Sequence, residues 1–202
     1  MRAPPGPRSD VSRPLAGLLL TGGTSRRMGR DKATLMVGGQ RLVDRAAAAL
    51  GEVCAPVLEV GPGRSGLDAV SEDPPGQGPL AAVAAGGRSL RTRGHRGPAI
   101  VLAVDMPNVT AALLRFLADI PGEASVVPFA AGRAQPLCAR YSEAELDLAA
   151  RLVAEGERSM QALLHAAHDV HWAGPRMWGP VAGPDAFADL DEPADLTRAM
   201  EP

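Results

Sequence analysis

The chain has 202 residues with a formal net charge of −2, 46% hydrophobic residues and 22% charged residues. This length suits one sizeable domain with a single core, and the composition excludes a disordered chain. The near-neutral charge gives no reason to expect nucleic acid or an anionic membrane as a partner, and no segment approaches the roughly 20 apolar residues of a membrane span.

The first residues, 1–13, are rich in Pro, Arg and Ser and are predicted to be a disordered lead-in before a domain over residues 14–202. The start superficially resembles a signal peptide. Its apolar run, however, ends in Gly-Gly and a basic cluster instead of a small-residue cleavage site. Two distant cysteines in apolar surroundings, Cys54 and Cys138, match no metal or redox spacing. We expect both to be buried and reduced, as in a cytoplasmic protein.

Short apolar runs then alternate with helical patterns. The predicted strands are residues 15–20, 57–60, 99–104 and 125–128, each apolar on both faces as in a covered parallel sheet. The predicted helices between them are 41–50, 79–90 and 110–118, the last capped by Thr110 or by Asn108. Further on, a strand is predicted over 135–141, a helix over 142–154 that begins with a capping box of Ser142 and Glu145, a helix over 159–167, a last strand over 187–190, and a helix beginning at Pro193. This order predicts an α/β fold: a Rossmann-like, doubly wound, mostly parallel sheet in a single three-layer α/β/α domain.

The segment TGGTSRRMGRDK, residues 21–32, connects the first strand to the next helical pattern. Gly22 and Gly23 allow backbone N–H groups to approach an anion, and Arg27 and Lys32 are among the four cations beside them. The segment fits neither G-x-G-x-x-G nor a Walker A loop, and a basic surface turn is the alternative. Lys32 is the only lysine among 21 Lys+Arg residues. Its ammonium is a point charge that can follow a moving phosphate.

LLLTGGTSRRMGRDKATL resembles the signature of molybdenum cofactor guanylyltransferases, L-A-G-G-x-S-x-R-M-G-x-D-K. SEDPPGQGPLAAV, VLAVDMPNVT, RAQPLCARY and FADLDEPADL resemble later segments of the same family in the same order, so the resemblance covers residues 15–198. Gly22-Gly23 is typical of the guanylyl branch, whereas cytidylyl relatives usually have Ala-Gly. Thr21 replaces the usual Ala, a small steric change.

The resemblance implies the site residues. Nucleotide binding is assigned to Leu20, Thr21, Gly22, Gly23, Thr24, Lys32, Asp73 and Gly78. Catalysis is assigned to Arg27, Lys32 and Asp105, and Mg²⁺ binding to Asp105 and Asp191, with Asp189 a rival for the latter. The expected reaction is Mg²⁺-dependent transfer of GMP from GTP to molybdopterin with release of pyrophosphate, residues after about 130 forming the cofactor side. A transient contact with molybdoenzymes or their chaperones is the partner that the family suggests.

The residues themselves support part of this assignment. Asp105 follows a strand at the edge where open α/β sheets bind ligands, and a carboxylate is a good Mg²⁺ ligand. Its alternative role is capping the turn before Pro107. Asp73 has the alternative of a turn residue, and Asp189 and Asp191 that of helix capping.

Two departures from the family leave the base and the acceptor open. Gly61 stands near the point where many guanylyl members carry an Asn that contacts the base, and the tail has Asp-x-Asp-Glu-Pro instead of Asn-x-Asn-Thr-Pro. The alternatives are a cytidylyltransferase or other nucleotidyltransferase, and a non-catalytic nucleotide- or cofactor-binding protein. A metal site in HAAHDVH is not expected, because a change from helix to strand should separate its histidines. RSLRTRGHR is expected to be a solvated basic loop. Trp172 and Trp178 are either core or the rim of the cofactor pocket.

Overall fold

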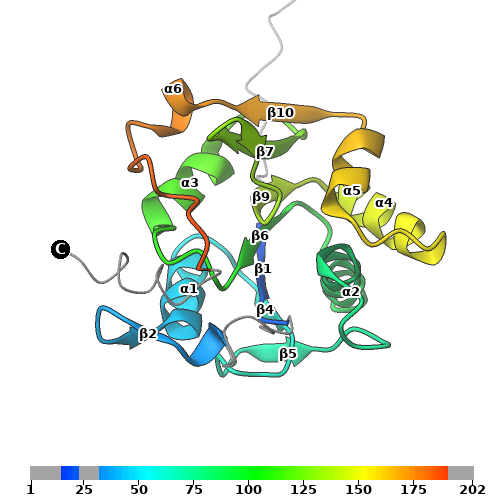
Figure 1. Ribbon diagram of the computed structural model, residues 1–202. Coiled ribbons are helices and arrows are strands. Elements are labelled where there is room, and N and C mark those ends of the chain that lie inside the picture. The colour runs from blue at the N-terminus through cyan, green and yellow to red at the C-terminus, as the bar shows by residue number, and fades with distance from the viewer. Residues whose placement is uncertain (1–14, 23–31, 191–202) are drawn as a thin grey trace, which may run out of the picture.

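The computed structural model describes residues 15–22 and 32–190. An eight-stranded sheet forms its centre, in the order β10-β7-β9-β6-β1-β4-β5 with β8 paired to β7 (Figure 1). Its strands are β1 (Ala16–Leu20), β4 (Val57–Val60), β5 (Asp68–Val70), β6 (Ala99–Ala103), β7 (Ser125–Ala130), β8 (Arg133–Ala134), β9 (Cys138–Tyr141) and β10 (Val170–Ala173). Strands β2 (Met36–Val37) and β3 (Gln40–Arg41) form a separate hairpin.

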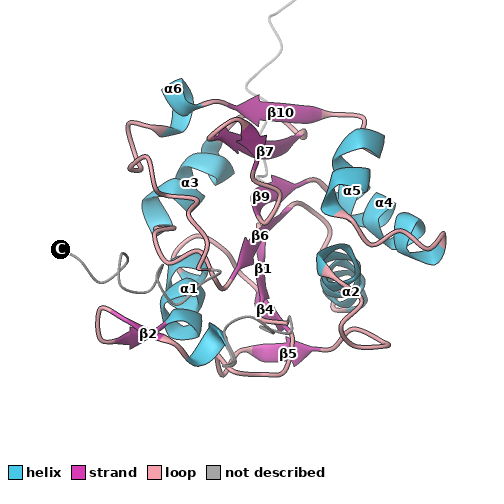
Figure 2. Cartoon of the chain, viewed as in Figure 1, coloured by secondary structure: helices cyan, strands magenta, loops and turns pink. Residues whose placement is uncertain are grey.

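Helices cover both faces of the sheet, as Figure 2 shows. One face packs against α1 (Leu42–Gly51) and α3 (Ala111–Asp119), and the other against α2 (Pro79–Thr92), α4 (Glu143–Ala154) and α5 (Met160–Ala166). Two short helices, η1 (Lys32–Thr34) and α6 (Pro175–Trp178), lie in the connections. The predicted three-layer α/β/α architecture with a mostly parallel sheet is confirmed.

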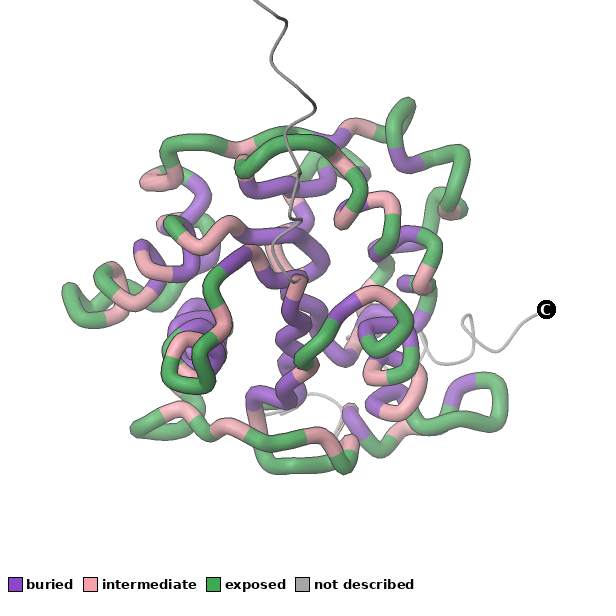
Figure 3. The backbone as a smooth tube through the Cα atoms, turned by 180° about the vertical axis from the view of Figure 1, so that it is seen from behind, coloured by how far each residue is buried: buried purple, intermediate pink, exposed green. Residues whose placement is uncertain are grey.

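The core follows from strands that are apolar on both faces. Leu18 and Leu19 of β1 are fully buried and contribute to the two separate apolar clusters on opposite faces of the sheet. Small residues let the layers approach: a Cβ on Gly86 of α2 would lie 2.8 Å from both methyl groups of Leu18. The central strands are accordingly buried along their length (Figure 3).

The structure differs from the prediction in strand order and in several short strands. β9 lies between β6 and β7 and is antiparallel to both. The short strands β5, β8 and β10 of the sheet, and β2 and β3 of the separate hairpin, were not predicted. The predicted last strand over residues 187–190 is wrong, because no strand is formed there. Phe187 and Leu190 lie in a segment without regular structure, but their side chains are buried. The Phe187 ring packs edge-on against Trp178, with ring centroids 5.1 Å apart. The helix expected from Pro193 lies outside the described residues.

Several local predictions are confirmed. Ser142 caps α4 by accepting from the Glu145 N–H at 3.3 Å, and Thr110 caps α3 in the same way through the Leu113 N–H. Cys54 and Cys138 are buried free thiols, and burial raises the pKa of each to about 12. Trp178 is in the core, whereas Trp172 is 48% exposed.

Candidate active site

The site is built where three parallel strands end together. Leu20, the last residue of β1, pairs with Val60 of β4 on one side and with Ala103 of β6 on the other. The residues that follow continue this alignment, since Thr21 N donates to the Val60 carbonyl at 3.0 Å and Val104 N donates to the Leu20 carbonyl at 3.0 Å. The loops after β1, β4 and β6 therefore start from one edge, where ligands bind in open α/β sheets.

Lys32 and Asp105 meet on the β6 side of this edge. Lys32 Nζ donates to Asp105 Oδ2 at 3.1 Å, across 73 residues of sequence. The side chains are 16% and 25% exposed, so both are half-sheltered yet reachable from solvent. Sequence reasoning selected these two residues separately, and the structure brings them into contact.

The segment before residue 191 lies across the end of β6. Leu190 N donates to the Asp105 carbonyl at 2.9 Å, and Asn108 Nδ2 donates to the Asp185 carbonyl at 3.0 Å. The Asp189 carboxylate lies 3.9 Å from Arg133 of β8. These contacts bring the late part of the chain beside Asp105. Within residues 15–22 and 32–190, no group of three or more His, Cys, Asp or Glu side chains is arranged to hold a metal ion.

The other predicted nucleotide-binding residues lie on the β4 side of the edge. Gly22 is exposed, and a Cβ there would lie 3.5 Å from Glu72 Oε1. Glu72 also accepts from the Gln77 N–H at 2.9 Å, whereas Asp73 is exposed. Gly78 precedes α2 with a φ of 98°, a conformation that favours glycine. Among the described residues, the carboxylate nearest to Gly22 is thus that of Glu72, which the sequence did not single out.

Four predicted residues lie outside the described residues: Gly23, Thr24, Arg27 and Asp191. Their assignments stay predictions.

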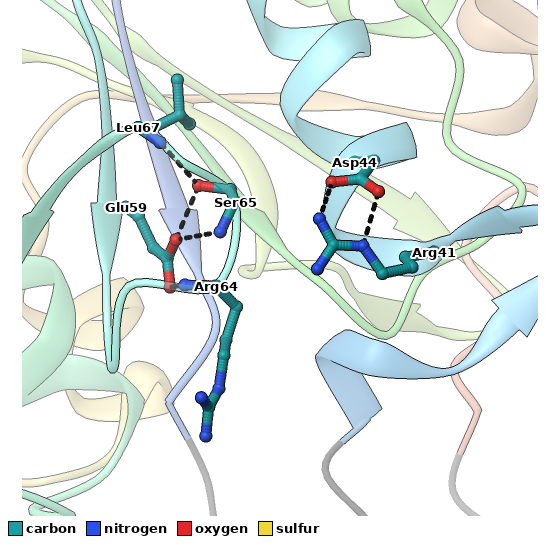
Figure 4. A network of polar contacts seen from close by, with 6 residues as sticks. All are labelled: Arg41, Asp44, Glu59, Arg64, Ser65 and Leu67. Carbon is teal, nitrogen blue, oxygen red and sulfur yellow. Dashed lines mark hydrogen bonds and ion pairs between the residues drawn. The ribbon is translucent and has the colours of Figure 1, made fainter.

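Sequence reasoning also missed Glu59, a buried carboxylate in the middle of β4. Its side chain accepts from Thr21 Oγ1 at 2.6 Å. It also accepts from Ser65 Oγ at 2.6 Å and from the Arg64 and Ser65 N–H groups, each at 2.7 Å (Figure 4). Burial opposes its ionisation, but the hydrogen bonds from Ser65, Thr21 and Arg64 outweigh burial and lower the pKa of Glu59. The signal in the sequence was a single Glu in the apolar run VLEV. The Arg41–Asp44 pair in the same figure is an exposed contact at the start of α1.

The remaining polar motifs do not form a second centre. His165 lies in the last turn of α5 and His171 lies in β10, as expected from the predicted change of structure. His165, His168 and His171 are exposed. The run RSLRTRGHR is only partly a loop, because α2 extends to Thr92. Arg91 pairs with Asp147 and Arg93 with Asp68. No helix in the described part of the chain is long and apolar enough to cross a membrane.

A doubly wound sheet whose carboxyl edge carries a glycine loop, a half-sheltered lysine and a strand-end aspartate defines a nucleotide-binding α/β protein. Comparison with known proteins makes this specific. The model of the MobA-like NTP transferase domain matches residues 17–170, and the chain belongs to this family. It is therefore a nucleotidyltransferase.

Similar proteins agree with this assignment. The chain is 42% identical over 165 residues to the probable molybdenum cofactor guanylyltransferase of Mycobacterium tuberculosis strain H37Rv, covering 76% of this chain and 81% of that protein. In fold it is similar to molybdopterin-guanine dinucleotide biosynthesis protein A from Archaeoglobus fulgidus, with a TM-score of 0.73, 23% identity and coverage of 92% and 96% of the two chains. It is also similar to the manganese complex of the Mycobacterium tuberculosis protein Rv0371C, with a TM-score of 0.68, 18% identity and coverage of 93% and 98%.

Proposed function

We propose that this enzyme transfers GMP from GTP to the terminal phosphate of molybdopterin, giving molybdopterin guanine dinucleotide and pyrophosphate, with Mg²⁺ as cofactor. The observation that carries the proposal is the Lys32–Asp105 pair, 3.1 Å apart at the carboxyl edge of β1 and β6. The name of the mycobacterial relative supports the guanylyl donor and the molybdenum cofactor as acceptor.

In the proposed reaction an oxygen of the acceptor phosphate attacks the α-phosphorus of GTP, and the bond from that phosphorus to the bridging oxygen breaks. The electron pair leaves with pyrophosphate. Positioning and charge stabilisation are the protein's main contributions to such a transfer. The N–H groups of Gly22, Gly23 and Thr24 are the proposed phosphate donors. Leu20 and Thr21 were also expected to donate, but the Thr21 N–H already donates to the Val60 carbonyl and Leu20 is paired on both sides as the last residue of β1. Lys32, together with Arg27, neutralises the departing pyrophosphate.

Asp105 fits the requirements of a divalent cation. Mg²⁺ is usually held by one or two carboxylates together with phosphate oxygens and water, so one strand-end aspartate is sufficient on the protein side. The Asp105 side chain is 25% exposed and lies 3.1 Å from Lys32. When bound, the ion supplies positive charge to the phosphate oxygens. A manganese complex of a protein with a similar fold supports a divalent metal ion as the cofactor. Asp191 is the proposed second carboxylate.

The acceptor side is proposed to be formed by residues after about 130. The segment 185–190 lies beside Asp105, and Arg133 of β8, an exposed cation, lies 3.9 Å from Asp189 of that segment. A transient contact with molybdoenzymes or their chaperones would deliver the product from this side.

The test is pyrophosphate release by the purified full chain with molybdopterin as acceptor, with GTP or CTP as donor, and with or without Mg²⁺. We expect release that requires Mg²⁺ and prefers GTP. A clear preference for CTP would establish the cytidylyl alternative. Binding of Mg·GTP without turnover would establish a non-catalytic binding protein.

A further inference from the structure

The buried carboxylate of Glu59 connects two loops that border the proposed nucleotide site. Glu59 is fully buried, and each of its carboxylate oxygens accepts from at least one protein donor. Oε1 accepts from Thr21 Oγ1 and the Arg64 N–H, and Oε2 accepts from the Ser65 N–H and Ser65 Oγ. Figure 4 shows the contacts with Arg64 and Ser65. Ser65 Oγ in turn accepts from the Leu67 N–H at 3.2 Å.

The first of these loops begins at Thr21, directly before the glycine pair. The second, residues 61–67, joins β4 to β5. The two loops are in contact: a Cβ on Gly61 would collide with Thr21 Oγ1 and would lie 2.8 Å from Gly22 N, at a φ of 150°. No larger side chain fits at position 61. At Gly22 and Gly61 the wall of the site on the β4 side therefore presents backbone, and its shape there depends on how the two loops are held together.

In the strand order β6-β1-β4, the two sides of the site differ in the groups that they present to the nucleotide. The charged pair Lys32–Asp105 lies on the β6 side and marks the reacting phosphates. The backbone wall lies on the β4 side, with β1 between it and β6, so about two strand spacings (roughly 10 Å) separate β4 from β6, a separation that the nucleoside end of the same nucleotide can span. We propose that Glu59 is a positioning residue that fixes this wall for nucleoside binding. This proposal rests on the proposed function.

The chemistry of Glu59 provides a selective substitution. Glu59→Gln keeps the size of the side chain but replaces one acceptor oxygen by an NH₂ group. Thr21 and Ser65 hydroxyls can rotate to accept from that group. The Arg64 and Ser65 N–H groups cannot, so one of them faces a donor whichever way the amide is placed. The contact between the two loops must then change.

Glu145 provides the matched control. It is also a buried carboxylate, at 3% exposure, and accepts from Ser125 Oγ and Ser142 Oγ. It lies at the start of α4, beside the first residue of β7, at the opposite edge of the sheet. Glu145→Gln therefore matches the change in charge and burial without touching the two loops.

The experiment measures KM for GTP, kcat, calorimetric Mg·GTP affinity and thermal unfolding for the full chain and both variants. We expect Glu59→Gln to raise KM for GTP and the dissociation constant of Mg·GTP about tenfold, with a smaller change in kcat. Glu145→Gln should leave KM, the dissociation constant and kcat near wild type. Equal KM values in the two variants, whatever their unfolding temperatures, would overturn the proposal.

If Glu59→Gln does not fold, the Thr21→Val variant tests the positioning role of Glu59 instead. It removes only the hydroxyl donor, and it should still raise KM severalfold; an unchanged KM refutes the positioning role. The proposed function fails separately. If the wild type binds Mg·GTP but releases no pyrophosphate, the transfer proposal is wrong, and the affinities of the same variants still test Glu59. A wild type that binds no nucleotide overturns both.

Discussion

Replacing Lys32 by Ala separates the two contributions that its ammonium group can make. The group lies 3.1 Å from Asp105, with side-chain exposures of 16% and 25%. At that separation Coulomb attraction is ~5 kcal/mol for an effective dielectric constant of about 20, but only ~1.3 kcal/mol in bulk water. Desolvation and the ordering of a long side chain offset most of it. Because water can reach Asp105 after the substitution, we expect a loss of about 1 kcal/mol in the free energy of unfolding.

The effect on the reaction should be far larger. Removing one charge or donor that stabilises a transition state commonly costs about 10²–10³ in kcat, or ~2.7–4 kcal/mol. We therefore expect Lys32→Ala to lower single-turnover GMP transfer by about two to three orders of magnitude. Its melting temperature should fall by only about 2–4 °C, the shift expected from ~1 kcal/mol in a domain of this size.

The assay is a single-turnover measurement of pyrophosphate release with saturating GTP, paired with thermal unfolding of the same preparation. Arg93→Ala is the control, because it breaks another ion pair, Arg93–Asp68, between the end of α2 and the start of β5. That pair lies at the opposite edge of the sheet, so turnover should stay near wild type. Turnover of Lys32→Ala within about threefold of wild type would refute the role assigned to Lys32.

Three further substitutions test other parts of the structure. Asp105→Asn removes the charge proposed to hold Mg²⁺, so the Mg²⁺ concentration for half-maximal turnover should rise at least tenfold; an unchanged Mg²⁺ titration contradicts that role. Arg140→Leu should lower the free energy of unfolding by about 3 kcal/mol without changing KM, which urea unfolding and steady-state kinetics measure. The reason is that the buried guanidinium donates to four carbonyls around the end of α3, those of Ala118, Ile120, Gly122 and Ala124. Because hydrogen bonds lower the pKa of Glu59 in the folded state, its carboxylate contributes stability above the unfolded pKa, about 4.3, which is lost as pH falls through the lower folded pKa. The stability difference between wild type and Glu59→Gln should thus be constant near pH 7 and shrink below about pH 4; a difference independent of pH contradicts the shift.

The sequence predicted the elements whose physical cause is local. The apolar runs of β1, β4 and β6 and the cap of α4 at Ser142 are set by residues adjacent in the chain, and the structure confirms them. The antiparallel insertion of β9 was not predictable in this way, because strand order depends on pairing between distant segments. The run 187–190 has the apolar character of a strand, but its burial comes from packing against α6.

The same division holds for the site. Lys32 and Asp105 were found because each stands in a recognisable motif. Glu59 was not found, because its role depends on Thr21, which lies 38 residues before it in the sequence, and on the conformation of the loop after β4. Thr21 itself was treated as a small steric change from Ala. The structure shows that its hydroxyl is used, since it donates at 2.6 Å to a carboxylate that has no contact with solvent.

Thr21 and Glu59 also explain why glycine occupies position 61. The hydroxyl that binds Glu59 fills the space that a side chain at position 61 would need. An Asn there would have to displace Thr21 and so disrupt the contact with Glu59. A base-contacting side chain at this position and the Thr21–Glu59 hydrogen bond are therefore mutually exclusive in this backbone.

The two sides of the site should also respond differently to substitution. Substitutions on the β6 side, at Lys32 or Asp105, should act mainly on kcat, whereas substitutions on the β4 side should act mainly on KM. A Gly61→Asn variant should raise KM for both GTP and CTP through the same loss as Glu59→Gln, and a double variant should be little worse than either single one.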